Sequence, residues 1–155
     1  MPPITEALAR AMKFELNTGT TALPTWVEVS NVNAASFSPS SVDANTTTFD
    51  DAGWQSHLKS SRTFSYTIGG LYQEDPDTGA RDPGQDAVEA WAEEIGPASR
   101  KEFRITSPSG QTTREFVATA ESSPAGIGSG GGNDDPNAWT VTVKQSGAAT
   151  VVTTP

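Results

Sequence analysis

A glycine-rich segment in the last third of the sequence has the spacing of a nucleotide-binding loop. Gly126-Ile127-Gly128-Ser129-Gly130-Gly131 matches the pattern G-x-G-x-x-G. Such a loop holds a pyrophosphate when it lies between a strand and the N-terminus of a helix. The residues that follow, Asn133-Asp134-Asp135-Pro136, predict no helix and place negative charge where a phosphate would bind. The segment is therefore predicted to be a loop that binds no nucleotide.

Acidic residues between positions 74 and 82 could serve a protease or a calcium site. Asp77-Thr78-Gly79 has the residue order of an aspartic-protease motif, but that chemistry needs two aspartates sharing a proton, and the triplet occurs once. Asp75, Asp77 and Asp82 could bind Ca²⁺, yet the twelve-residue loop with a terminal glutamate is missing. The sequence predicts a solvated acidic turn.

His57 is the single histidine, and the chain has no cysteine. Disulfides and thiolate metal sites are thereby excluded. A catalytic triad or a zinc site would have to use His57, and no spacing around it supports either. We predict a surface or interface histidine, with no catalytic residue, metal site or cofactor, and no enzymatic function.

The composition restricts the partners. The net charge is −9 and the sequence pI is about 4.4, the opposite sign to a protein that gains affinity by neutralising phosphates. Mean hydropathy is −0.44, and the sequence contains neither a long apolar run nor a signal peptide. We expect no tight nucleic-acid binding, no membrane association and a cytoplasmic site of synthesis.

Hydrophobic periodicity predicts one domain over residues 1–155, made of short strands and one helix. Alternating apolar and polar residues predict strands at 11–16, 25–33, 62–72, 100–106, 112–121 and 139–144. A cap at Asp82, Pro83 after it and an apolar stripe predict an amphipathic helix over residues 82–95. The predicted core consists of large apolar residues on these elements: Phe64, Tyr66, Ile68, Val88, Trp91, Ile95 and Trp139.

Three segments outside this pattern are expected to be arms or loops. Residues 1–10 are predicted to be an N-terminal arm, and residues 146–155 a tail in which 150–154 could add an edge strand. Residues 34–61 form a connection too long for a compact domain unless it is functional. Its aromatic residues Phe37, Phe49 and Trp54 have to pack on something. We therefore predict that this long loop contacts another subunit.

The passage over residues 46–72 carries a resemblance to a known family. A threonine run at 46–48 leads into Phe49-Asp50-Asp51-Ala52-Gly53-Trp54, then a polar spacer, the aromatic strand from Arg62 and Gly69-Gly70, all ahead of the single helix. This order resembles the tail tube (major tail) proteins of long-tailed bacteriophages. The resemblance implies two packed antiparallel sheets, a sandwich or split barrel, flanked by one helix.

The resemblance also implies a function. Such subunits form hexameric rings that stack into a hollow tube, through which DNA passes during ejection without specific binding. The loop over residues 34–61 is then expected to reach the adjoining ring through Phe49, Asp50, Asp51, Gly53 and Trp54. Implied partners are further copies of the chain, a tape measure protein, and tail terminator and baseplate proteins. The implied location is the virion, assembled in the cytoplasm of a bacterial host.

Two alternatives remain open at this stage. The inner tube of a contractile tail or injection apparatus shares the fold, and the sequence carries no sheath signal that separates the two. A carbohydrate-binding β-sandwich is the other alternative, in which exposed aromatic rings would stack on sugars. Its candidate platforms are Trp26, Trp54, Trp139 and Tyr72.

Overall fold

The computed structural model describes residues 11–48, 54–122 and 138–153. Within them the strands are β1 (Lys13–Asn17), β2 (Trp26–Glu28), β3 (Val32–Asn45), β4 (His57–Leu71), β5 (Lys101–Thr106), β6 (Thr112–Ser122), β7 (Ala138–Gln145) and β8 (Thr150–Thr153). One α-helix, α1 (Pro83–Glu93), is followed by a 3₁₀ turn at Gly96–Ser99. The described part of the chain is thus mainly β with a single α-helix, as the sequence predicts.

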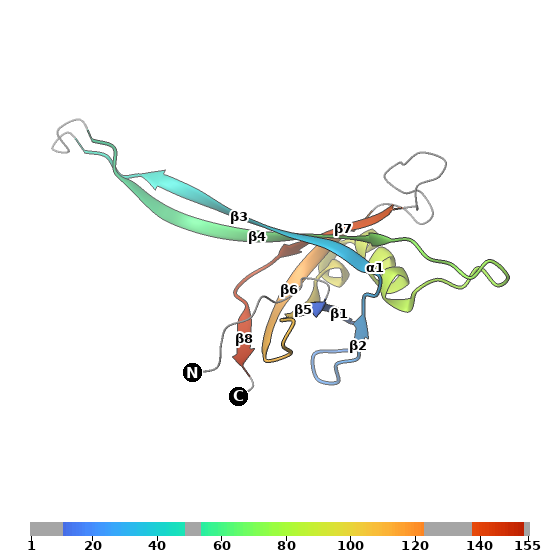
Figure 1. The fold of residues 1–155 in the computed structure, drawn as a ribbon. Coiled ribbons are helices and arrows are strands. Elements are labelled where there is room, and N and C mark those ends of the chain that lie inside the picture. The colour runs from blue at the N-terminus through green and yellow to red at the C-terminus, as the bar shows by residue number, and fades with distance from the viewer. Residues whose placement is uncertain (1–10, 49–53, 123–137, 154–155) are drawn as a thin grey trace, which may run out of the picture.

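All strand pairs in the described residues are antiparallel. Seven strands follow one path, in the order β2-β1-β5-β6-β7-β4-β3, and β8 lies off this path. Strand β6 has two different partners along its length: residues 112–115 pair with β8, and residues 118–122 pair with β7. The sheet also curls, so that Tyr66 of β4 stacks on Phe116 of β6 with ring centroids 5.1 Å apart. The architecture is a split barrel that does not close, with two layers joined through β6 (Figure 1).

Helix α1 fills one end of the curled sheet. Asp82 caps it by accepting a hydrogen bond from the Gln85 amide at 3.0 Å, and Pro83 takes the first position. Trp91 is fully buried and lies 6.0 Å from the ring of Phe103 on β5. The buried core gathers apolar residues of α1 and most strands: Phe14, Leu16, Val29, Tyr66, Ile68, Val88, Trp91, Phe103, Ile105, Phe116, Ala118, Trp139, Val141 and Val143. Phe64 is half-buried against this core.

Ile95 is not part of the core, contrary to the sequence prediction. Helix α1 ends at Glu93 and residue 94 is already extended, so Ile95 lies beyond the helix and is 88% exposed. Polar side chains occupy the inner face of the helix in its place. Gln85 is fully buried and donates to the Leu71 carbonyl at 2.9 Å, which ties the helix to the end of β4.

Glu89 forms a buried polar network on the same face. Its carboxylate lies 2.7 Å from Arg81 Nη1 and accepts a hydrogen bond from Trp139 Nε1 at 3.1 Å. The guanidinium of Arg81 also lies 4.9 Å from the ring centre of Tyr72. This carboxylate therefore connects α1, the segment before it and β7. Removing it leaves Trp139 Nε1 without its acceptor and leaves Arg81 Nη1 paired with Asp86 alone.

Replacement of Glu89 by alanine is expected to cost about 3 kcal/mol of unfolding free energy, because it breaks a buried ion pair from one side. Glu93→Ala is the matched control, since Glu93 is exposed on the same helix and should cost below about 0.5 kcal/mol. Urea denaturation of both variants measures the difference. Equal values would show that the Glu89 network contributes nothing specific.

The prediction of a long loop over residues 34–61 is wrong, because most of this segment is β-strand. Most of it belongs to β3 and the first part of β4, which pair from Val32↔Gly70 out to Asn45↔His57 with irregularities at Val32/Ala34 and Val42/Asp43. The hairpin extends far beyond the rest of the sheet (Figure 1). The predicted strand over 25–33 is also two strands, divided at Asn31, whose φ is +59°.

Glycine at position 70 permits this arrangement. A Cβ there would lie 2.5 Å from the Asn31 carbonyl oxygen, which accepts the Leu71 amide at 3.1 Å. Strand β4 continues through Gly69-Gly70 to Leu71, one residue short of the predicted end at residue 72. Residues 150–153 form β8 against β6, as the sequence suggested for the tail. The predicted arm over residues 1–10 lies outside the described residues.

Candidate subunit-contact surfaces

The outer part of the β3–β4 hairpin has the exposed apolar residues expected of an interface. Every residue of β3 from Asn33 to Asn45 is exposed, as are His57 to Thr63 of β4. Among them Val42 is 63% and Leu58 64% exposed, and Trp54 near the tip is 81% exposed. A hairpin with little of its own surface buried is poorly stabilised alone, and contact with another surface would stabilise it.

Of the predicted ring-contact residues, the structure describes Trp54 alone. Phe49, Asp50, Asp51 and Gly53 lie outside the described residues. His57, whose side chain is exposed, begins β4 and lies 3.4 Å from Gln55 Oε1. The segments flanking the predicted contact thus converge at the tip of the hairpin, while the contact itself stays a prediction.

Aromatic rings anchor the inner part of the hairpin to the body. Phe37 on β3 lies 5.2 Å from both Phe64 and Tyr66 on β4. Burial raises the pKa of the Tyr66 phenol, and the nearby Arg114 guanidinium partly opposes this. An apolar cavity of about 370 Å³ opens beside these rings and is lined also by Phe14, Ile68 and Ile105. The sequence analysis does not find this cluster, because it assigns Phe37 to the long loop over residues 34–61.

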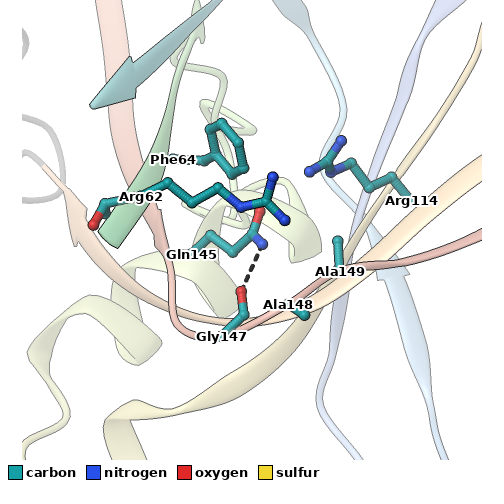
Figure 2. A pocket seen from close by; sticks show the side chains of 8 residues that line it. Arg62, Phe64, Arg114, Gln145, Gly147, Ala148 and Ala149 are labelled. Atoms are coloured by element: carbon teal, nitrogen blue, oxygen red, sulfur yellow. Dashed lines mark hydrogen bonds between the residues drawn. The ribbon is translucent and has the colours of Figure 1, made fainter. Parts of the chain in front are cut away.

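A second cavity, of about 460 Å³, contains two arginines in its lining, and we call it the arginine pocket. Its lining residues are Arg62, Thr63, Phe64, Arg114, Gln145, Gly147, Ala148 and Ala149. Figure 2 shows the guanidinium groups of Arg62 and Arg114 entering it from opposite sides beside the Phe64 ring. The Cζ atom of Arg62 lies 6.0 Å from the centre of the Phe64 ring, and that of Arg114 lies 5.3 Å from it. Gln145 donates to the Gly147 carbonyl at 2.7 Å and lines the floor.

An acidic turn projects from the other end of β4, and residues 74–82 define it. The Asp75 amide donates to Ala80 at 2.8 Å and the Gly79 amide to Asp75 at 2.7 Å, which closes the turn. The Asp75 carboxylate accepts the amides of Asp77 and Thr78, and these bonds lower its pKa. The predicted solvated acidic turn is therefore present and locally ordered.

Alkaline titration tests the surroundings of Tyr72 at the base of this turn. Its hydroxyl donates to Glu74 Oε2 at 2.8 Å, and this bond is the largest cause that raises the Tyr72 pKa. In a Tyr66→Phe background Tyr72 is the only phenol, and we expect Glu74→Gln to lower its midpoint toward the ordinary value of about 10. Tyrosinate absorbance against pH measures this, and an unchanged midpoint would contradict the assigned hydrogen bond.

The same titration bears on stability through Tyr66. Because its folded pKa is raised, the stabilisation from the neutral phenol is complete below the ordinary pKa of about 10 and is lost as pH rises through the folded value. Tyr66→Phe should therefore flatten the alkaline decline in thermal midpoint. A decline of the same steepness in wild type and variant would exclude this origin.

Three of the four aromatic platforms proposed for sugar stacking are covered. Trp139 is 2% exposed, the Arg104 guanidinium lies 4.2 Å from the Trp26 ring, and Arg81 covers Tyr72. Of the four, Trp54 alone is largely exposed, at 81%. No cluster of metal ligands occurs among the described residues. No helix in the same part of the chain is long and apolar enough to span a bilayer.

Comparison with solved structures identifies the fold. The chain matches one from the virion of a native gene transfer agent particle with a TM-score of 0.63 and 12% identity, over 95% of this chain and 99% of that one. A chain from the tail of an empty gene transfer agent particle, with C6 symmetry, gives 0.62 and 15% identity over 94% and 98%. The tube-terminating cap of the anti-feeding prophage gives 0.57 and 13% identity over 99% and 95%.

The fold is therefore that of tail components of phage-like particles, and it covers nearly the whole chain. This confirms the fold predicted from the passage over residues 46–72. No protein-family model matches the chain, and no curated protein matches it by sequence. The similarity to the solved structures therefore lies in the backbone fold and not in the amino-acid sequence.

Proposed function

We propose that the chain is the subunit of a tail tube, in which hexameric rings stack into a hollow conduit for DNA. The observation that carries the proposal is the match, over nearly the full length of both chains, to a tail chain of a C6-symmetric particle. A structural role also agrees with the prediction that the chain is not an enzyme, since the solved structures it resembles are particle components.

The outer hairpin gives the proposal a physical basis. Its exposed apolar residues need a partner surface, and an adjoining ring would supply one for Val42, Trp54 and Leu58. The curled sheet is not closed within one subunit, and pairing with neighbouring copies would remove exposed strand edges. Of the proposed contact residues, Trp54 belongs to the exposed part of the chain that leads into β4; Phe49, Asp50, Asp51 and Gly53, outside the described residues, are proposed to take part in the same contact.

Net charge supports the proposed passage of DNA. At −9 per subunit, a tube would carry a dense negative charge and repel the phosphate backbone, so DNA could move without sticking. The proposed partners are further copies of the chain, a tape measure protein, and terminator and baseplate proteins. The proposed location is the virion, after assembly in a bacterial cytoplasm.

The anti-feeding prophage chains favour a second candidate, the inner tube of a contractile apparatus, with TM-scores of 0.57 and 0.54. Negative-stain microscopy of the concentrated protein tests both candidates together, and we expect hollow filaments with sixfold end views. A protein that stays monomeric at high concentration and in low and high salt would contradict both. Co-expression with a sheath protein separates them, because only the second candidate binds one.

A further inference from the structure

We propose that the acidic turn of one copy docks into the arginine pocket of the next. This inference rests on the proposed function, because it assigns one contact between subunits of the assembly. The contact joins two different surfaces of the same chain. Three observations support this contact: the arginines of the pocket have no acidic partner, the acidic turn is ordered, and the turn and the pocket lie on opposite sides of the subunit.

The arginine pocket holds cations that have no acidic partner. Arg81, Lys101, Arg104 and Lys144 each form an ion pair at 2.6–2.9 Å. Within the described residues Arg62 and Arg114 form none, and the buried atoms Arg114 Nε and Gln145 Oε1 lack a hydrogen-bond partner. Two guanidinium groups that face one cavity repel each other, and a carboxylate between them would relieve that repulsion and bind both.

The acidic turn offers a carboxylate held in place before binding. Internal hydrogen bonds close the turn from Asp75 to Ala80, and Pro76, Asp77 and Thr78 form its exposed tip. The Asp77 carboxylate has no partner among the described residues, whereas Asp75 is engaged by two amides of the tip. An ordered loop loses little conformational freedom on docking, which favours this segment over a longer or irregular one.

The two surfaces lie on opposite sides of the subunit. Figure 1 shows the turn before α1 projecting from one end of the sheet, while the pocket residues lie where β7 leads into β8, toward the other end. A turn on one side cannot reach the pocket of its own chain, but it can reach that of a neighbour. Contacts between unlike surfaces repeat in one direction, so they generate rings or filaments.

Charge reversal tests the contact. Asp77→Lys or Arg62→Glu alone is expected to raise the protein concentration needed for assembly at least about tenfold, by placing like charges together. The double variant should recover much of the loss, since it restores an opposite-charge pair. Glu93→Lys and Lys13→Glu change the same charges at exposed positions elsewhere and should assemble as wild type does. Assembly of the Asp77→Lys variant at the wild-type concentration would overturn the proposal.

Cysteine cross-linking tests the contact without requiring a tube. The chain has no cysteine, so a disulfide between a Thr78→Cys chain, which keeps Asp77, and an Ala148→Cys chain reports only their encounter. We expect a mixed dimer that Arg62→Glu in the second chain abolishes, and little product when Glu93→Cys replaces Thr78→Cys. Equal yields from positions 78 and 93 would contradict the docking.

The two experiments separate this inference from the tube. Cross-linked dimers without filaments would support the docking and exclude the tube. Filaments that neither charge reversal affects would support the tube and exclude the docking. Phosphate is the other anion that could enter the pocket. If Arg62→Glu weakens binding of a short DNA duplex and leaves assembly unchanged, the pocket binds phosphate and the docking is wrong.

Discussion

A subunit whose outer hairpin is replaced by a tight turn is expected to fold normally and to form no filaments. The variant joins Ser41 directly to Arg62 through Asn-Gly, a sequence that favours the two-residue turns of hairpins. Ser41 and Arg62 are opposite each other in the ladder, so the register of the remaining strands is kept. The described residues among those removed contribute nothing to the buried core, whereas they include Val42, Trp54 and Leu58, which the proposed ring contact needs.

Thermal unfolding tests whether the shortened subunit folds normally, and negative-stain microscopy tests whether it forms filaments. The thermal midpoint should stay within a few degrees of wild type, and filaments should disappear at every concentration at which wild type forms them. A Leu23→Ser variant is the control, because Leu23 is 79% exposed in another loop and its loss should leave filaments intact. Filaments from the shortened chain would remove the hairpin from the contact between rings.

Replacement of Trp91 by alanine is expected to destabilise the subunit by about 3–5 kcal/mol, the largest effect of any single substitution considered. The ring is fully buried and stacks on Phe103. Its Nε1 donates to the Ser99 carbonyl at 2.7 Å, so the substitution also leaves that carbonyl without its donor. Since α1 fills one end of the split barrel, a cavity there loosens the contacts of the helix with β1, β2 and β6.

Urea denaturation followed by far-ultraviolet circular dichroism gives this value directly. Trp54→Ala is the matched control, with the same chemical change at a side chain that is 81% exposed. It should alter monomer stability by less than about 0.5 kcal/mol and should weaken assembly instead. A small effect at Trp91, or a large one at Trp54, would contradict the assignment of the first to the core and the second to an interface.

The helix and the body strands could be predicted because local signals and tertiary structure agree there. Asp82 and Pro83 mark the start of α1 in both sequence and structure. Alternation places Tyr66, Ile68 and Trp139 on the buried face, where the structure has them. Each of these signals depends on a few neighbouring residues, so no knowledge of distant contacts is needed.

The long hairpin was mistaken for a loop because its outer part buries neither face. Serine, alanine and aspartate outnumber large apolar residues in β3, so the usual signal of a strand is weak. A signal was present, since Ala35, Phe37 and Pro39 alternate with serines at 36, 38 and 40. Abundant serine favoured the loop interpretation, and Pro39 removed one backbone donor from the expected ladder.

Polar partners explain the remaining differences. Apolar spacing predicted Ile95 in the core, but hydrogen bonds of Gln85 and Glu89 let polar side chains occupy the inner face of α1. Periodicity that counts only apolar residues cannot show this. Arg62 and Arg114 meet beside Phe64 although they lie far apart in sequence, and only the curl of the sheet brings them together.

The irregularity at Val42/Asp43 divides the hairpin into two mechanical parts. Inward of it, Phe37 is held by Phe64 and Tyr66; outward of it, every described residue is exposed. A bulge interrupts the ladder and bends its strand, so the outer segment can tilt without disturbing the packed rings. Subunits joined through such tips would make a shaft that bends by small rotations at each joint and keeps every globular body rigid.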